Sequence, residues 1–285
     1  MTSTKPLLAW LGTGLMGSPM AERLLASGYP VSVWNRTRAK AEPLTDFGAA
    51  IAETPADAVA NSNIVLTMLS DAGAVEFALS GVDLSGKAVV QMSTIGPSEN
   101  LRLANRVGDA GGSYLEAPVL GSIPEARSGR LIIMAGGAEA LFTKLKPILS
   151  CLGPEPRLVG PVGQASALKL ALNQLIASLT VAFSTSLAFV EENNVNVECF
   201  MDILRQSALY APTFDKKLSK MLERNYRNPN FPTEHLIKDI DLFKQEAKTI
   251  DTEVLEVLRQ LYGRAQAWHE REDYSCVYDS VIGRG

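Results

Sequence analysis

The sequence is poor in the residues that build metal centres and disulfide frameworks. It contains three cysteines and two histidines in 285 residues. Cys151, Cys199 and Cys276 are far apart, and no Cys-x-x-Cys pair occurs. We therefore expect neither a disulfide scaffold nor a metal site, and we interpret His235 and His269 as ordinary helix residues. So few cysteines suit a reducing compartment, which predicts a cytoplasmic protein.

Charge of one sign is not in excess either. The chain has 27 Lys and Arg against 31 Asp and Glu, a net charge of -4. A protein that binds nucleic acid or an anionic membrane usually carries a basic surplus. The balance therefore favours a small-molecule substrate, with no nucleic acid and no membrane as partner. The first residues also lack the apolar segment and the cleavage site of a secretory signal, so none is expected.

Long apolar runs are absent except over residues 170–190, which hold no charged side chain. A run of this length could span a bilayer. However, it contains several polar residues, Asn173 and Gln174 among them, and its only adjacent basic residue is Lys169. We therefore expect a helix buried at the centre of a helical domain or in a subunit interface.

The length predicts two domains, each large enough to bury its own core. In the first half, short apolar runs alternate with helical periodicity, which is typical of an α/β domain with a largely parallel, doubly wound sheet. Past Cys151, dense Gly-Pro turns give way to helical periodicity, so we place an α/β domain over 1–162 and an all-helical domain over 163–285. Strands are expected at 64–69, 88–92, 114–119 and 131–134, and helices at 72–79, 99–110, 138–149, 164–192, 197–206, 214–224, 233–249 and 251–268.

A glycine-rich turn near the N-terminus organises the first domain. The apolar run 7–11 leads into Gly12, Gly14 and Gly17, spaced Gly-x-Gly-x-x-Gly, and an apolar-periodic segment follows. Such a strand, turn and helix place a pyrophosphate at the helix N-terminus, where the backbone N–H groups are unpaired. A second strand at 31–34 completes a βαβ unit. The pattern predicts a dinucleotide site, and the residues between the glycines belong to it: Thr13, Leu15 and Met16.

The end of the second strand indicates which dinucleotide is bound. An NAD site usually places a carboxylate there to bind the ribose 2′-hydroxyl. This chain has Asn35, Arg36 and Thr37 instead, followed by Arg38. A guanidinium and a hydroxyl suit the 2′-phosphate of NADP. The alternative is that Arg36 and Arg38 are only solvated loop residues.

Lys169 and Asn173 are the candidate catalytic residues. They lie four residues apart on the long apolar helix, so they share one helix face. A lysine that is poorly solvated on such a helix is a competent proton donor or acceptor, and hydride transfer to a carbonyl requires one. The alternative from spacing alone is that Lys169 extends to solvent at the start of the helix.

These segments together resemble the β-hydroxyacid dehydrogenase family, which includes 3-hydroxyisobutyrate dehydrogenases and glyoxylate/succinic semialdehyde reductases. The matching stretches are Gly12–Ala21, Trp34–Thr37, Ser93–Pro97, Ala117–Val119, Gly163–Gln164 with Lys169 and Asn173, and Lys238–Asp239. The resemblance implies an N-terminal Rossmann domain, an all-helical C-terminal domain and a homodimer or homotetramer.

The resemblance also implies roles for particular residues. Lys169 would donate a proton to the substrate oxygen, and Asn173 would hydrogen-bond the substrate beside it. Lys238 would reach the cofactor from the helical domain. Three further residues would line the cofactor: Met68, Leu69 and Thr94.

One segment departs from the family pattern, which commonly reads Asp-Ala-Pro-Val-Ser-Gly-Gly. This chain has Leu120, Gly121 and Ser122 in the last three positions. The family serine helps to hold the substrate carboxylate, and Leu120 has no donor for that purpose. Ser122 or the backbone of Gly121 would have to substitute. A small aldehyde that bears a carboxylate is the expected substrate.

Two other functions stay open at this point. Imine reductases share the architecture and would suit the apolar Leu120, although they generally replace the catalytic lysine. A catalytically silent NADP-binding module would use the same fold for sensing or scaffolding. Lys169 disfavours the first function, and retention of both Lys169 and Asn173 disfavours the second.

Overall fold

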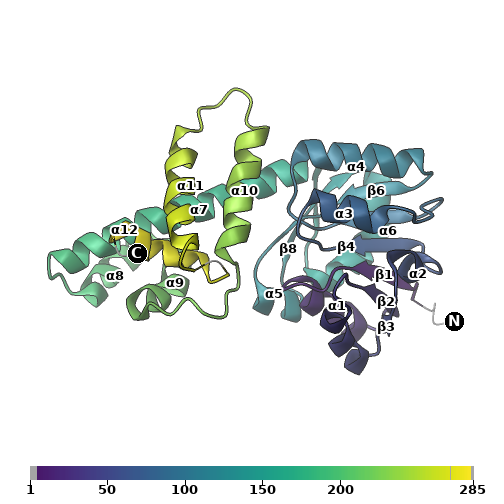
Figure 1. The fold of residues 1–285 in the computed structure, drawn as a ribbon, viewed down its shortest axis with the longest axis horizontal. Coiled ribbons are helices and arrows are strands. Elements are labelled where there is room, and N and C mark those ends of the chain that lie inside the picture. The colour runs from purple at the N-terminus through teal and green to yellow at the C-terminus, as the bar shows by residue number, and fades with distance from the viewer. Residues whose placement is uncertain (1–4, 270, 284–285) are drawn as a thin grey trace. The chain divides into compact units, whose positions relative to one another are not determined.

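The computed structural model describes residues 5–269 and 271–283 (Figure 1). The chain forms two compact units that divide between Lys169 and Leu170. This division falls inside a helix, whereas the predicted boundary at 162 precedes that helix.

The first unit is built on a sheet whose strand order is β3-β2-β1-β4-β5-β6-β8-β7, with β9 paired to β8. The strands from β3 to β6 are mutually parallel, and β8 runs antiparallel to β6 and β7. The expected largely parallel sheet is therefore confirmed. The strands are β1 (Leu8–Leu11), β2 (Val31–Trp34), β3 (Ala50–Ile51), β4 (Ile64–Thr67), β5 (Ala88–Gln91), β6 (Ser113–Glu116), β7 (Val119–Leu120), β8 (Ile132–Gly137) and β9 (Arg157–Gly160).

Helices cover both faces of this sheet, and alternate strand residues face opposite cores. Leu8 and Trp10 of β1 pack in one core, whereas Ala9 and Leu11 pack in the other. Side chains of α1, α5 and α6 complete the first core, and those of α2, α3 and α4 complete the second. The helices are α1 (Gly17–Ala26), α2 (Pro55–Val59), α3 (Ala72–Leu79), α4 (Pro97–Asp109), α5 (Ile123–Ser128) and α6 (Glu139–Leu152), with 3₁₀ turns at Arg38–Lys40 and Glu42–Phe47.

One predicted strand is wrong in extent. Residues 114–119 were expected to form a single strand, but β6 ends at Glu116 and β7 begins at Val119. Pro118 between them has no N–H to donate to a neighbouring strand. The chain therefore leaves β6 here and pairs again as β7, with Val119 opposite Ile133 of β8. This break places Glu116 at a strand end.

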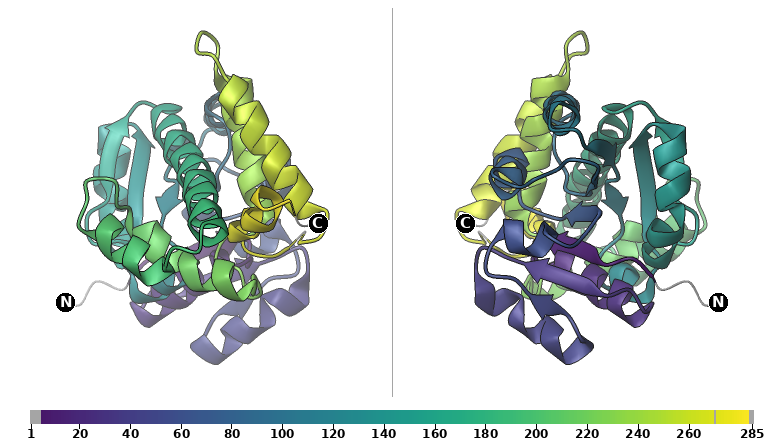
Figure 2. Two further views of the ribbon diagram at one scale, coloured as in Figure 1. Left: turned by 90° about the vertical axis from the view of Figure 1, so that its left-hand side faces the viewer. Right: turned by 90° about the vertical axis from the view of Figure 1, so that its right-hand side faces the viewer.

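The second unit is all helical, as expected. It contains most of α7 (Gln164–Glu192), together with α8 (Val197–Arg205), α9 (Pro212–Glu223), α10 (Thr233–Glu246), α11 (Glu253–Gln266), a 3₁₀ turn at Tyr274–Cys276 and α12 (Val277–Val281). Figure 2 shows α10 and α11 lying side by side. Ala177 of α7 packs in one core with residues of these two helices, and Phe183 and Leu187 pack in a second core with α8, α9 and α12.

Candidate active site

The turn between β1 and α1 has the tight geometry that its three glycines predict. Gly12 has a φ of +109°, and a Cβ added there would lie 2.3 Å from the carbonyl oxygen of Met68. A Cβ on Gly17 would lie 2.1 Å from the carbonyl oxygen of Gly12. Neither position can hold a side chain. A Cβ on Gly14 would meet no atom within 4 Å, so the backbone there is open to a ligand.

Asn35 ties this turn to the end of β2. Its Oδ1 accepts the N–H of Thr13 at 3.0 Å, and its Nδ2 donates to the carbonyl oxygen of Thr37 at 2.8 Å. The Thr13 hydroxyl is buried and has no hydrogen-bond partner within the described residues. A buried hydroxyl without a partner beside an open glycine turn fits a phosphate group that supplies the missing hydrogen bond. Leu15 is exposed and Met16 half-buried at the same turn.

Arg36 and Arg38 differ in what they contact. Arg38 forms an ion pair with Glu53, and its Nε lies 3.4 Å from Oε1 of Glu42. Arg36 is exposed, and across residues 5–269 and 271–283 its guanidinium makes no ion pair or side-chain hydrogen bond. Thr37 beside it is also exposed. Arg36 is therefore the cation that remains available to a ligand at the end of β2.

The other residues expected to line the cofactor follow the ends of neighbouring parallel strands. Met68 and Leu69 follow β4, and the N–H of Leu69 donates to Ser93 Oγ at 2.8 Å. Thr94 follows β5 and is half-buried. The carboxyl ends of parallel strands meet at one edge of a sheet, so the structure brings these residues to the same edge as the glycine turn.

Lys169 and Asn173 are both buried on α7, with 8% and 2% of their surfaces exposed. Asn173 Nδ2 donates to Asp239 Oδ2 of α10 at 2.6 Å. Its Oδ1 has no partner within the described part of the chain. Because Asp239 accepts from Nδ2, the amide is held with its oxygen directed elsewhere. The small exposed fraction of Lys169 disfavours the alternative that its side chain extends into solvent.

Asp239 was not among the predicted site residues. It is buried, and the Nζ of Lys238 lies 3.3 Å from its Oδ1. Lys238, which was expected to contact the cofactor, therefore contacts Asp239 in this structure. The sequence carried one signal for Asp239: a carboxylate stands on the buried face of α10 between Leu236 and Ile240. Buried carboxylates are normally paired.

In the segment that departs from the family pattern, the polar side chain of Ser122 already has a hydrogen-bond partner. Leu120 ends β7 and is half-buried. Ser122 is the N-cap of α5 and donates both its N–H and its hydroxyl to Oε2 of Glu125. Ser122 thus caps its own helix with the only donors that it has. Gly121, with a φ of +135°, is exposed between them.

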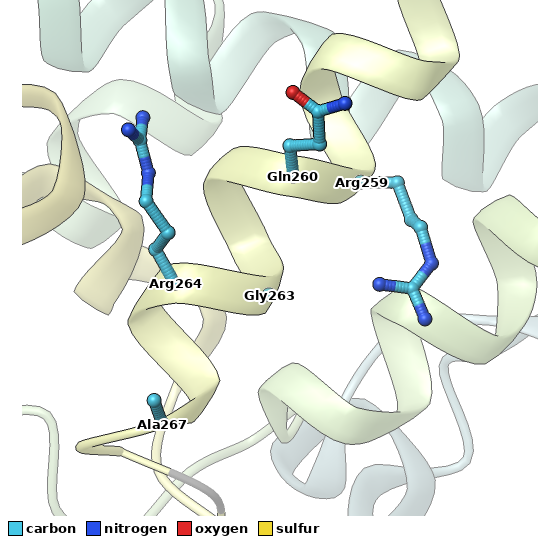
Figure 3. Close-up of a pocket in the computed structure, with 5 residues that line it drawn as sticks. All are labelled: Arg259, Gln260, Gly263, Arg264 and Ala267. Carbon is cyan, nitrogen blue, oxygen red and sulfur yellow. The ribbon is translucent and has the colours of Figure 1, made fainter.

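A hollow on the helical unit lacks the features of a ligand-binding site. Figure 3 shows it along α11, lined by Arg259, Gln260, Gly263, Arg264 and Ala267. The side chains of Arg259 and Arg264 point away from each other, and Arg259 Nε is bonded to Asp241 at 3.1 Å. No convergent set of donors forms. Within the described residues there is also no cluster of three or more His, Cys, Asp or Glu that could hold a metal ion.

The doubly wound sheet and its glycine turn define a nicotinamide-dinucleotide oxidoreductase. Residues 7–160 match the family described as the NAD binding domain of 6-phosphogluconate dehydrogenase. Residues 163–280 match the family described as NAD-binding of NADP-dependent 3-hydroxyisobutyrate dehydrogenase. The chain belongs to the β-hydroxyacid dehydrogenase family, and it is an enzyme, an NAD(P)-dependent hydroxyacid dehydrogenase.

Two relatives that are named as reductases agree with this assignment. Glyoxylate/succinic semialdehyde reductase 1 of Arabidopsis thaliana is 35% identical over 82% of this chain and 83% of its own length. Reductase 2, chloroplastic, of the same plant is 30% identical over 96% and 79%. The solved 3-hydroxyisobutyrate dehydrogenase of Mycobacterium tuberculosis with L-serine has a TM-score of 0.89 at 21% identity, over 97% of this chain and 99% of its own. An imine reductase from Myxococcus stipitatus with NADP+ has a TM-score of 0.67 at 26% identity, over 95% and 98%.

Proposed function

We propose that this enzyme uses NADP(H) to interconvert a small carboxylate-bearing aldehyde and its hydroxy acid, with Lys169 as the proton donor. The observation that carries the proposal is the burial of Lys169 one helical turn before Asn173, whose amide is held by Asp239. The two plant relatives, which are named for glyoxylate and succinic semialdehyde, support the substrate class.

The chemistry divides between the cofactor and the chain. When bound, the nicotinamide supplies or accepts the hydride. As the carbonyl is reduced, negative charge develops on its oxygen, and the ammonium group of Lys169 stabilises that charge and transfers a proton to it. Asn173 orients the same oxygen, and Asp239 keeps the Asn173 amide in one orientation through the 2.6 Å hydrogen bond. A fixed amide loses less entropy when substrate binds.

NADP is the proposed cofactor because of what stands at the end of β2. Asn35 stands in place of the usual carboxylate, and its side-chain amide is hydrogen-bonded to the backbone of Thr13 and of Thr37. Arg36 next to it is exposed, and its guanidinium has no acidic partner in the described chain. A guanidinium binds a phosphate through charge-assisted hydrogen bonds, whereas a ribose hydroxyl gives it little to bind. Arg36 with Thr37 therefore favours a 2′-phosphate.

The substrate carboxylate would be held weakly near β7. Leu120 offers no donor, and both donors of Ser122 are taken by Glu125. The backbone N–H of Gly121, an exposed residue, is the donor that we assign to the substrate in this segment. An imine, which has no acid group, would not need one. Because Leu120 would suit a substrate without an acid group, imine reduction is the second candidate function. The presence of Lys169 disfavours it, since imine reductases generally replace this lysine.

The test of the proposed function is a substrate panel. Glyoxylate, succinic semialdehyde, an uncharged aldehyde of similar length and a cyclic imine are assayed with NADPH and with NADH. The proposal expects the highest kcat/KM with a carboxylate-bearing aldehyde and NADPH. Preference for the imine over every aldehyde would overturn it.

We further propose that the enzyme is a homodimer or homotetramer, located in the cytoplasm, and that α7 forms part of the subunit interface. Helix α7 is long and apolar enough to cross a membrane by length and composition, and 39% of its most apolar stretch is buried. Its exposed residues Leu175, Leu179 and Phe189 lie on one stripe, whose full membership steps by three and four: Leu172, Leu175, Leu179, Ala182, Ser186 and Phe189. Such a seam is typical of helices that pair in water.

Light scattering tests this interface. Leu175 is 52% exposed and Phe189 66% exposed, so a charge at either position costs a monomer little. The double substitution Leu175→Glu and Phe189→Glu is expected to give monomers. Lys144→Glu on the exposed surface of α6 is the control for the introduction of a glutamate at the surface. An unchanged oligomer would refute the interface.

A further inference from the structure

Glu116 is a buried carboxylate that the proposed chemistry does not use, and it stands where the family pattern begins with Asp. It ends β6, and none of its surface is exposed. Its Oε1 accepts the backbone N–H of Gly163 at 2.7 Å and of Ala165 at 3.0 Å. These two groups belong to the turn that starts α7, the helix on which Lys169 stands four residues after Ala165. One carboxylate oxygen thus joins the end of a core strand to the base of that helix.

The surroundings of Glu116 are shaped to hold it in one place. Gly136 is its partner on β8, and a Cβ there would lie 2.3 Å from Glu116 Oε1. Gly136 has no positive φ, so the absence of a side chain is needed for space rather than for backbone conformation. A carboxylate at a helix N-terminus also interacts favourably with the partial positive charge of the unpaired N–H groups.

Burial raises the pKa of Glu116, and hydrogen bonding by Ser166 and by the N–H groups of Gly163 and Ala165 opposes that effect. Burying a carboxylate is costly unless it is well bonded. A plain apolar residue would fill the strand end without that cost, and a local cap is possible in this unit, since Thr54 and Asp57 cap the start of α2 from next to its own first turn. Capping α7 from 47 residues away fixes its position on the sheet as well as its start.

We propose that Glu116 is the positioning residue for Lys169: it anchors the first turn of α7 to the end of β6 and thereby sets where the lysine ammonium stands. This inference rests on the proposed role of Lys169. A helix start that shifts by about 1 Å moves the lysine by a comparable distance, and displacements of that size cost roughly 10²-fold in rate.

The experiment compares variants by kcat, by the KM for NADPH and by melting temperature. Glu116→Ala removes the acceptor and is expected to lower kcat by about 10- to 100-fold with an unchanged KM for NADPH. Glu116→Gln keeps an acceptor oxygen of the same reach and is expected to restore most of kcat. Gly136→Ala leaves Glu116 in the sequence but displaces its carboxylate, so it is expected to lower kcat like Glu116→Ala.

Two controls separate positioning from general loss of structure. Asp57→Ala removes the capping carboxylate of α2, and Gly108→Ala adds a methyl group where nothing lies within 4 Å. Both are expected to leave kcat unchanged. Should Glu116→Ala not fold, Gly136→Ala and Glu116→Gln still decide the question, since normal kcat in Gly136→Ala with a correctly folded protein overturns the proposal.

A double-mutant cycle shows whether Glu116 acts through the lysine. In a Lys169→Ala background, Glu116→Ala and Gly136→Ala are expected to cause no further loss, because residues that act as one unit are not additive. A further loss equal to that in the wild-type background would contradict the proposal. If Lys169→Ala itself keeps a normal kcat, the proposed function fails. If Lys169→Ala is inactive while Gly136→Ala and Glu116→Ala keep a normal kcat, only the role of Glu116 fails.

Discussion

Arg36→Ala tests the proposed cofactor preference. Arg36 is exposed at the end of β2 and its guanidinium has no acidic partner in residues 5–269 and 271–283, so its removal disturbs no ion pair there. A hydrogen bond to a charged group contributes roughly 1.5–3 kcal/mol, which corresponds to about 10- to 150-fold in affinity. Because the site is exposed and screened by salt, the lower end of this range is the expected one. NADH has no 2′-phosphate and should be almost unaffected.

The assay measures KM for NADPH and for NADH at low and at physiological ionic strength. Lys40→Ala is the matched control, because Lys40 is an exposed cation four residues further along the chain. We expect Arg36→Ala to raise the KM for NADPH about 10-fold or more, with a smaller effect at higher salt, and Lys40→Ala to change it little. Equal losses with both cofactors would show that Arg36 holds the loop rather than the phosphate.

Three more variants test other parts of the account. Leu120→Ser adds a donor at the end of β7 and should lower the KM for succinic semialdehyde without changing that for an uncharged aldehyde; no change for either would remove Leu120 from the substrate site. Asp239→Ala frees the Asn173 amide and should lower kcat by about 10- to 100-fold, whereas Asp241→Ala, which breaks only a surface pair with Arg259, should not. Burial raises the pKa of Glu116 above its usual 4.5, so the stability it contributes is present at low pH and is lost as pH rises through the folded-state pKa. Thermal unfolding from pH 4 to 8 should therefore show wild type losing stability relative to Glu116→Gln as pH rises, and a constant difference would mean that the carboxyl does not titrate in this range.

The sequence predicted the parts of the molecule whose signals are local. The glycine turn is one, because Gly12 and Gly17 are required by contacts within one βαβ unit and with the adjacent strand. The long helices of the second unit are another, because their apolar periodicity extends over many residues. Helix α2 and strand β3 were missed, since five and two residues are too few for a periodic pattern.

The buried polar partners could not be predicted in the same way. Glu116 bonds to groups 47 and 49 residues away, and Asp239 to Asn173 across 66 residues. No spacing rule links such positions, because the strand order and the helix packing bring them together. The break at Pro118 shows a related limit: the apolar run 114–119 suited one strand, and a single missing N–H divided it. Ser122 and Glu125 have the Ser-x-x-Glu spacing of a capping box, so the sequence alone could have predicted their hydrogen bond. The resemblance to the family suggested a substrate-binding role for Ser122 instead.

The most direct test of the central claim is the rate of aldehyde reduction by Lys169→Ala, measured with and without an added primary amine. General acid catalysis contributes about 10²–10⁴-fold, so kcat on succinic semialdehyde or glyoxylate should fall by that factor. Energy transfer from the buried Trp10 of β1 and Trp34 of β2 should show that NADPH still binds. Lys144→Ala serves as the surface control. Partial recovery of kcat is expected as a small primary amine replaces the lost ammonium group, whereas a near-normal kcat in Lys169→Ala without amine would contradict the role of Lys169 as proton donor.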